Sequence, residues 1–310
     1  MKKMYFIKSI ESDKVILDLW GGTQIYYISS KKYVIVRDCG MFSNISVAIF
    51  GIFILSINGY DIDEIEVTMT DYFWDRNIYP LLFEKQNVDL SFDFLSEDEI
   101  EFFVKNCHPT MVGLGLKNWG NTYIGSNIHN FDFRITKKII DKFFKPKKEV
   151  IDVYNKMLVN KNLIGNDFVF VWARKTDKVE ETSVPSAENY VEILKHYNLI
   201  EDRIFIQTDD KTMFDDFKSL NLNFDYFDDI PFAKGYSFHR LISKTPDNEF
   251  LLDYGITKNE YMIKMLCVIL FSINSKKSII YPGNPTTLSP MFKNTFDDFI
   301  LFRDNKNLFQ

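Results

Sequence analysis

The stretch Phe168-Val-Phe-Val-Trp-Ala-Arg-Lys-Thr-Asp-Lys-Val-Glu-Glu181 passes directly from an apolar run into a charged one. Residues Phe168 to Trp172 are all apolar, aromatic or β-branched, which is the composition of a strand buried on both faces of a parallel sheet. From Arg174 onward, most side chains are basic or acidic. We therefore expect a central strand of an α/β sheet that ends in a charged loop.

The charged loop is a candidate ligand site. In an open α/β sheet, ligands bind in the crevice outside the carboxyl ends of the strands. Arg174 supplies bidentate donors and Lys175 a mobile positive charge, which suits an anionic ligand such as a sugar diphosphate. The alternative is a surface loop whose charges pair among themselves. The residues alone leave both interpretations open.

Length and composition favour two domains of ordinary size. A chain of 310 residues with 46% hydrophobic content has enough apolar residues for two cores. Its net charge of -6 argues against a general nucleic-acid-binding surface. The cysteines form no CxxC pair and the histidines no HxxH or HExxH pair, so we expect no disulfide framework and no metal site.

No segment has the pattern of a membrane span or a signal peptide. The most apolar window, residues 45–57, is shorter than the roughly 20 residues that cross a bilayer. The chain starts with basic residues, but the charges between Lys8 and Lys14 interrupt the apolar core that a signal peptide needs. Together with the unpaired cysteines, these features predict a cytoplasmic protein without a transmembrane segment.

The N-terminal half contains a strand-helix-strand pattern. Residues 33–37 and 65–69 have strand composition, and the apolar window 45–57 between them predicts a buried helix. The dipeptide Ser43-Asn44 is suited to cap the start of this helix, and Gly59 to end it. Such a βαβ unit implies that its two strands pair in parallel.

The second half repeats this alternation. Strand patterns cover 203–207, 224–227 and 277–281, and helical patterns cover 135–144, 149–159, 186–197, 212–220 and 259–272. The segment Pro282 to Ser289 is expected to be a loop that follows the last of these strands. We therefore predict an α/β protein with two Rossmann-like domains, residues 1–160 and 161–310, that face a cleft.

An aromatic segment in the first half is a candidate site for a sugar acceptor. It contains Tyr72, Trp74 and Asp75, and aromatic faces match the C–H faces of a hexose ring. Ordinary packing at the rim of a core is the alternative for these residues.

Three motifs occur in a fixed order in the second half. They are Val171-Trp-Ala-Arg-Lys-Thr-Asp-Lys-Val179, then Pro185 with Glu188 and Tyr190, then Thr208-Asp-Asp210. Together they resemble the α-1,6-fucosyltransferase and NodZ family, whose signature is a strand ending in H-x-R-R-T-D-K, a downstream proline, glutamate and tyrosine, and a second strand ending in A-T-D-D. Beyond Asp210 the resemblance is weaker, and the N-terminal half matches only in its α/β character.

The resemblance implies a GT-B fold and an inverting transfer of fucose from GDP-fucose, without a metal ion or another cofactor. The C-terminal domain would hold the nucleotide-sugar donor. Arg174 takes the place of the family arginine that binds the donor β-phosphate, where a preorganised guanidinium stabilises the leaving diphosphate. Thr176, Asp177 and Lys178 match the family's T-D-K.

The acids of the second strand end, Asp209 and Asp210, match the family's donor-side acids. Capping of the next helix is the alternative for this pair and is compatible with a role at the site. The family's catalytic glutamate lies just after the T-D-K. Glu181 is our choice for the base that takes the acceptor's proton, with Glu180 as the alternative and Thr182 directly in register.

Several positions depart from the family pattern. Trp172 stands where the family has a guanine-contacting histidine and is expected to stack on the base of the donor, and Val268 stands near the family's guanine-contacting aspartate. Lys175 replaces the second arginine, which keeps the charge and loses the fork. The family's final T-F-S-S-Q is absent, and the side chains expected to contact phosphate or sugar oxygens in its place are those of Asn284, Thr286 and Thr287.

The sequence therefore predicts a fucosyltransferase-like glycosyltransferase of glycan biosynthesis. Its donor would be a nucleotide sugar, GDP-fucose first, and its acceptor a hydroxyl of a glycan or glycoconjugate. One alternative is the same fold with a UDP- or dTDP-linked sugar. Another is a non-catalytic carbohydrate-binding relative, which the altered base-contacting positions favour and the retained Arg174, Asp177 and Lys178 oppose.

Overall fold

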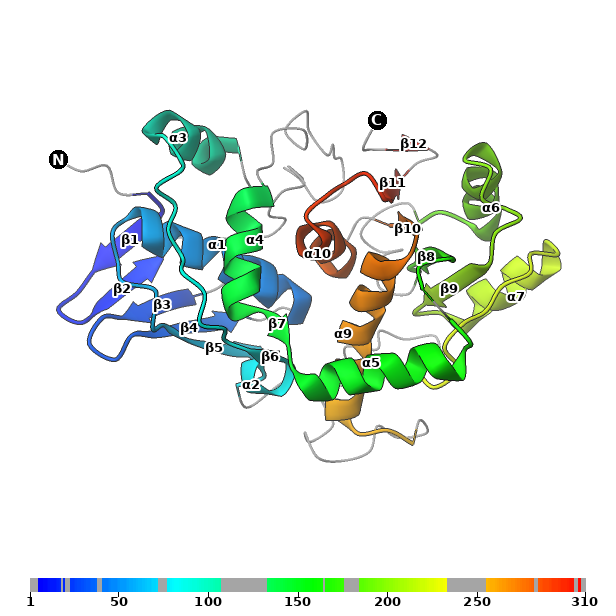
Figure 1. Cartoon of the computed structure of the whole chain (residues 1–310), viewed down its shortest axis with the longest axis horizontal. Helices are drawn as coiled ribbons and strands as arrows, with labels where there is room; N and C mark the ends of the chain where they lie inside the picture. Colours follow the sequence, from blue (N-terminus) through cyan, green and yellow to red (C-terminus); the bar gives the residue numbers. More distant parts are fainter. Residues whose placement is uncertain are drawn as a thin grey trace. The chain divides into compact units, whose positions relative to one another are not determined.

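The structure is a computed structural model, and Figure 1 shows the whole chain. It describes residues 5–17, 19, 23–37, 41–71, 77–106, 133–163, 165–175, 184–232, 255–281, 284–303 and 306–307. The chain divides into two compact units, with the change from the first to the second at Lys147/Lys148. Each unit has its own sheet, and both mix helices with strands, which confirms the α/β class.

The N-terminal unit is built on a five-stranded sheet in which each strand lies beside the next one along the chain. Its strands are β1 (Ile7–Ile10), β2 (Lys14–Leu17), β3 (Thr23–Tyr27), β4 (Lys32–Arg37) and β5 (Glu66–Asp71). The first four pair antiparallel, and β4 and β5 pair in parallel. The sheet is therefore an antiparallel meander that ends in the predicted βαβ unit.

The crossover helix of this unit, α1 (Met41–Ile57), is buried along nearly its whole length. It begins earlier than the sequence predicted, so Ser43 lies inside the first turn, and the predicted cap at Ser43-Asn44 is wrong. Its end is as predicted. Gly59 has φ 83°, its amide donates to the Ser56 carbonyl at 2.8 Å, and the Tyr60 amide donates to the Leu55 carbonyl at 3.1 Å. This is the Schellman pattern, which favours glycine.

Further helices complete the N-terminal unit, with α4 packed on α1. They are α2 (Tyr79–Leu82), α3 (Glu97–Asn106) and α4 (Phe133–Phe143), and a short two-stranded sheet joins β6 (Phe83–Glu84) to β7 (Lys145–Pro146).

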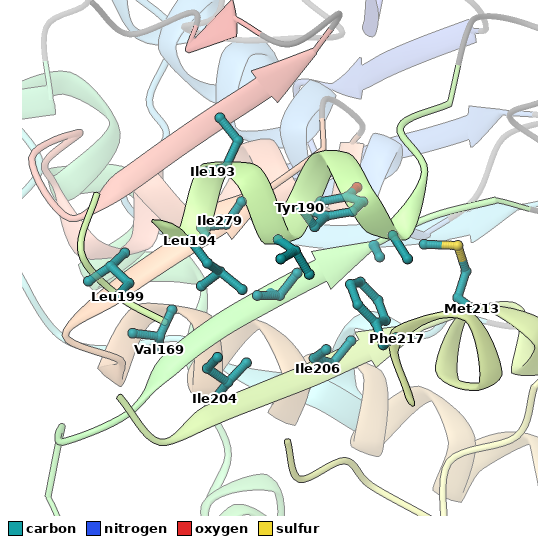
Figure 2. Close-up of a cluster of buried hydrophobic side chains, with 14 of the residues drawn as sticks. Val169, Tyr190, Ile193, Leu194, Leu199, Ile204, Ile206, Met213, Phe217 and Ile279 are labelled. Atoms are coloured by element: carbon teal, nitrogen blue, oxygen red, sulfur yellow. The ribbon is translucent and has the colours of Figure 1, made fainter. Parts of the chain in front are cut away.

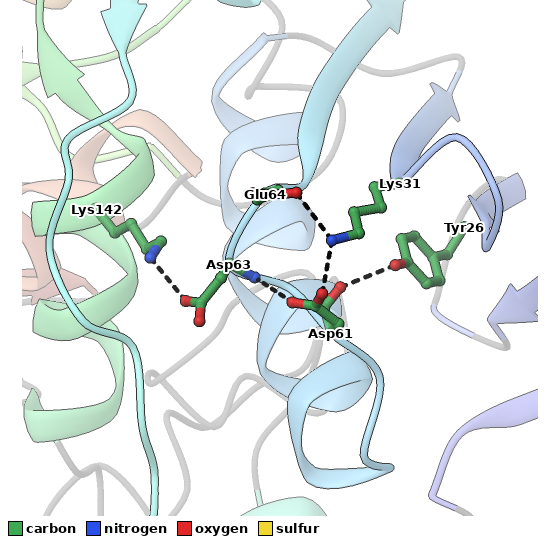
Figure 3. A network of polar contacts seen from close by, with 6 residues as sticks. All are labelled: Tyr26, Lys31, Asp61, Asp63, Glu64 and Lys142. Carbon is green, nitrogen blue, oxygen red and sulfur yellow. Dashed lines mark hydrogen bonds and ion pairs between the residues drawn. The ribbon is translucent and has the colours of Figure 1, made fainter.

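The turn before β5 carries a polar network (Figure 3). The Lys31 ammonium donates to Asp61 at 2.7 Å and to Glu64 at 2.9 Å. The Lys142 ammonium, which is buried on α4, donates to Asp63 at 2.8 Å. These charges thus hold a turn to its neighbours within the unit.

The C-terminal unit has a second five-stranded sheet, in the order β12-β11-β10-β8-β9. Its strands are β8 (Val169–Ala173), β9 (Ile204–Thr208), β10 (Lys277–Ile280), β11 (Phe299–Arg303) and β12 (Lys306–Asn307). The neighbours β9, β8, β10 and β11 all pair in parallel, and β12 is antiparallel. The chain runs outward from β8 to β9 on one side and from β10 to β11 on the other, so the direction of winding reverses between β8 and β10.

The helices of the C-terminal unit cover both faces of its sheet. They are α5 (Lys148–Asn160), α6 (Ala187–His196), α7 (Lys211–Ser219), α9 (Lys258–Asn274) and α10 (Asn284–Lys293). On one face, side chains of β8 and β9 pack with α6 and α7 in the cluster drawn in Figure 2, for example Val169, Ile206 and Phe217. On the other face, the Phe271 ring of α9 stacks on Phe205 at 5.9 Å between centroids.

The domain boundary differs from the predicted one at 160/161. Helix α5 belongs to the C-terminal unit because it packs on α9. The rings of Tyr154 and Phe271 lie 4.9 Å apart, and Asn274 Nδ2 donates to the Tyr154 hydroxyl at 2.8 Å. An amphipathic pattern fixes the apolar face of a helix and not the sheet that this face covers, so the sequence alone does not decide the boundary.

Two further expectations differ from the structure. The predicted strand 224–227 is reduced to one parallel bridge between Asp225 and Phe205. The segment from Pro282 to Ser289 is not a loop throughout, because α10 begins at Asn284. Of the helices in the described ranges, none has both the length and the apolar character needed to cross a membrane.

Candidate functional site

The reversal between β8 and β10 fixes where a ligand site is expected in the C-terminal unit. From β8 the chain winds toward one edge of the sheet, and from β10 it winds toward the other. Ligands of open α/β sheets bind at such a reversal, outside the carboxyl ends of the strands. Strand β8 ends at Ala173, so Arg174 is the first residue beyond it. Arg174 is only 9% exposed, which places a nearly buried guanidinium-bearing residue at this edge.

Asp209, the first residue beyond β9, joins the two strand ends. Its Oδ1 accepts a hydrogen bond of 2.8 Å from the backbone amide of Lys175, and its Oδ2 lies 3.7 Å from Nε of Arg174. Parallel pairing of β8 with β9, in which Ala173 is opposite Thr208, brings these residues together. One carboxylate therefore contacts both the backbone after β8 and the guanidinium at its end.

Asp210 has a different role from its neighbour. Its Oδ1 accepts from the Thr212 amide and from the Thr212 hydroxyl, both at 2.8 Å. It is the N-cap of α7, as expected for an aspartate before a helix. The capping alternative for this residue is thus confirmed, and no contact of Asp210 to the β8 end is needed to explain it.

Lys175 lies along α7. Its ammonium donates to the Thr212 hydroxyl at 3.0 Å and is 3.5 Å from Oδ2 of Asp216. Its side chain is about one third exposed, at 35%. The positive charge predicted from the sequence is therefore present at the site and is paired with side chains of helix α7.

Tyr190 lies below the end of β8. It comes from α6 and belongs to the buried cluster of Figure 2. Burial raises the pKa of its hydroxyl, with the neighbouring Tyr281 and Asp209 acting in the same direction, and a backbone hydrogen bond from Arg174 opposes the rise. The phenol is accordingly neutral at physiological pH.

Helix α10 starts directly after β10, on the other side of the reversal. Its first turn contains Asn284, Thr286 and Thr287, and no acidic residue. The amino end of a helix favours anions through its backbone amides and its dipole. The predicted contacts of these three side chains stay predictions.

Trp172 is a core residue in this structure. It is 3% exposed, and its ring packs edge-on against Phe170 with centroids 6.1 Å apart. Val268 on α9 is fully buried as well. Both side chains are thus covered by other residues in this structure, and the stacking of a base on Trp172 stays a prediction.

Other predicted site residues lie outside the described ranges, and their assignment stays a prediction. They are Thr176, Asp177, Lys178, Glu180 and Glu181 after β8, and the acceptor candidates Tyr72, Trp74 and Asp75. Within the described ranges, no three His, Cys, Asp or Glu residues are grouped closely enough to hold a metal ion.

Two contacts of the site were not predicted. Thr212 and Asp216 on α7 both meet the Lys175 ammonium. Their spacing of four residues puts them on one face of a helix, which is the signal that the sequence offered. It was insufficient because the sequence does not show which face of α7 turns toward the end of β8.

Comparisons with known proteins give a likeness of structure only. No protein-family model matches the sequence, and no curated protein matches it. The chain is similar to the structure of fucosyltransferase NodZ from Bradyrhizobium, with 10% identity, 85% of this chain and 94% of that chain covered, and a TM-score of 0.48. NodZ α-1,6-fucosyltransferase soaked with GDP-fucose gives 10% identity, coverage of 84% and 91%, and a TM-score of 0.47. The same enzyme co-crystallised with GDP gives 10% identity, coverage of 83% of this chain and 90% of that chain, and a TM-score of 0.47. At this identity and TM-score, the likeness assigns no substrate and no residue role to this chain.

Proposed function

We propose that this chain is a glycosyltransferase that moves a sugar from a nucleoside-diphosphate donor to a hydroxyl of a glycan or glycoconjugate. GDP-fucose is the first donor to test, and a cytoplasmic location stays part of the proposal. The observation that carries it is the position of Arg174, nearly buried beyond the carboxyl end of β8 and beside the reversal of the sheet. A dinucleotide or phosphate ligand of an α/β sheet binds at this position.

The proposed reaction is a direct displacement that inverts the anomeric carbon. The bond from that carbon to the acceptor oxygen forms as its bond to the donor phosphate oxygen breaks. Glu181 takes the proton of the acceptor hydroxyl, and the nucleoside diphosphate leaves with the bonding electrons. Arg174 stabilises the charge that develops on the diphosphate, and in this proposal no metal ion is required.

Two buried positions bear on which nucleotide base the donor carries. Trp172 and Val268 are both buried, so the described residues at these two positions expose no polar group to a guanine. This favours, as a second candidate, a transferase of the same kind that uses a UDP- or dTDP-linked sugar.

Thermal unfolding of the purified chain with GDP, UDP, dTDP, CMP and ADP tests the proposal. A ligand that binds only the folded state raises the melting temperature by mass action. We expect a nucleoside diphosphate to raise it, to the same extent with and without Mg²⁺. A rise with UDP or dTDP alone would replace GDP as the donor nucleotide. No rise with any nucleotide would overturn the transferase in favour of a non-catalytic carbohydrate-binding protein.

A further inference from the structure

The two neighbouring aspartates after β9 have contacts of different kinds, although the sequence predicts the same role for both. Asp210 is fully accounted for as the cap of α7. Asp209 contacts two residues of the other strand end, Arg174 and Lys175. The difference calls for a separate role for Asp209.

We propose that Asp209 is the positioning residue of Arg174 and does not itself contact the donor. The inference rests on the proposed function only for the task of Arg174, which is to stabilise the leaving diphosphate. An arginine side chain has several rotatable bonds, and ordering it costs conformational entropy unless a neighbour fixes it. A functional group works best when contacts from surrounding residues hold it in its productive geometry.

The geometry supports positioning over ligand contact. The carboxylate of Asp209 is closest to Nε, the nitrogen nearest the stem of Arg174, at 3.7 Å. A carboxylate in this position approaches the side of the guanidinium and not its end. The other oxygen of Asp209 is occupied by the Lys175 amide at 2.8 Å, so the same residue fixes the backbone that carries the arginine.

Charge supports the same conclusion. A diphosphate carries negative charge, and a carboxylate in contact with it would repel it. A carboxylate at the Nε side of the guanidinium can hold the arginine in place, and the guanidinium then lies between the carboxylate and the diphosphate. Asp209 is partly buried, with a side-chain exposure of 24%, so its attraction to Arg174 is less screened than that of a surface pair.

The position of Arg174 can be tested without any donor, through its chemical reactivity. Phenylglyoxal modifies accessible arginines, and mass spectrometry of the digested full-length chain gives the rate at Arg174. The variant Asp209→Asn keeps an acceptor for the Lys175 amide and loses the charge that faces Nε. We expect Arg174 to react several-fold faster in Asp209→Asn and at the wild-type rate in Asp210→Asn, which loses the same charge one residue away and keeps a good helix cap.

A transfer assay adds the functional part. We expect Asp209→Asn to lower kcat roughly 10- to 100-fold with little change in the donor KM, because a misplaced group costs mostly in the transition state. The control is Asp225→Asn, which breaks another aspartate–arginine pair of this unit, with Arg203 at 2.7 Å, and leaves Arg174 untouched. It should change neither kcat nor the modification of Arg174.

The outcomes separate the two proposals. Equal modification of Arg174 in wild type, Asp209→Asn and Asp210→Asn would overturn the positioning role, whatever the transfer assay gives. A rise in the donor KM with unchanged kcat in Asp209→Asn would also overturn it, because that result marks a donor contact. Faster modification of Arg174 in a chain that binds no nucleotide would uphold the positioning role and contradict the proposed function.

Discussion

The sheets of the two units differ in where their charged side chains lie. In the N-terminal unit, strands β1 to β4 run up and down, so their ends alternate between the two edges of the sheet. The charges of its polar network, such as Lys31 and Asp61, pair with one another at a turn (Figure 3). In the C-terminal unit, four parallel strands end at one edge, and Arg174 and Asp209 meet there.

The difference teaches that strand direction, more than charge content, decides where this chain can build a site. Parallel strands bring residues from distant parts of the sequence to a single edge, as Arg174 and Asp209 show. The antiparallel pairs of β1 to β4 bring mainly sequence neighbours together. The polar network lies at the amino ends of the parallel pair β4 and β5, where Lys31 meets Asp61 and the charges stabilise the turn before β5. Substitutions in each unit test this difference.

The largest expected effect is on catalysis, from Arg174→Ala. We expect transfer to fall by at least 10²- to 10³-fold, about 3–4 kcal/mol in the barrier, because the group that stabilises the leaving diphosphate is lost. The fold should persist, since the residue lies beyond the end of β8. Initial rates and far-UV circular dichroism measure both. Near-wild-type turnover in a folded variant would refute the assignment of the site to this edge.

A smaller effect, on stability alone, is expected in the N-terminal unit from Gly51→Ala. A Cβ at Gly51 would lie 1.8 Å from the Tyr33 hydroxyl oxygen and 2.7 Å from its ring. Such overpacking costs about 1–3 kcal/mol, against which the better helix propensity of alanine returns up to ~1 kcal/mol. Urea unfolding should show the loss, and calorimetry should show unchanged nucleotide affinity.

The Gly51 variant has an internal control. Adding Tyr33→Phe removes the closest atom of the clash and should recover part of the lost stability. If Gly51→Ala weakened nucleotide binding as strongly as Arg174→Ala does, the separation of the two units in function would be wrong.

The smallest effect concerns the polar network. A hydrogen bond from Lys31 is the main cause that lowers the pKa of Asp61, and hydrogen bonds to Asp61 and Glu64 raise the pKa of Lys31. The depressed carboxyl contributes stability above its unfolded pKa of about 4 and loses it as the pH falls below that value. The raised ammonium contributes below about pH 10 and loses its contribution at higher pH.

Melting curves of wild type and Lys31→Met between pH 3 and pH 8 check this effect. The variant should melt slightly lower than wild type at pH 7, and the difference should shrink at pH 3, which is below the unfolded pKa of the carboxyl. The same difference at both pH values would show that the ion pair contributes nothing. Both pairs are exposed, so the change is expected to be small.

Much of the local structure follows from the sequence because local chemistry determines it. Gly59 ends α1, Asp210 begins α7, and the apolar run before Arg174 forms a central parallel strand. Ser186 begins α6, whose boundaries agree with its helical pattern. Patterns of this kind need no knowledge of the partner elements.

The errors arise where distant packing decides. Helix α5 packs on α9, so the boundary lies at Lys147/Lys148 and not at 160/161. The separate roles of Asp209 and Asp210 depend on which of the two side chains turns toward β8, and adjacent letters in a sequence do not contain that information.

Hydrogen exchange of the full chain, with and without its nucleoside diphosphate, tests the central claim most directly. The nucleotide to use is the one that raises the melting temperature most. The account predicts slower exchange at the carboxyl ends of β8 and β9, including the amides of Arg174, Lys175 and Asp209, and no change in β1 to β4. Protection confined to the N-terminal unit would contradict it.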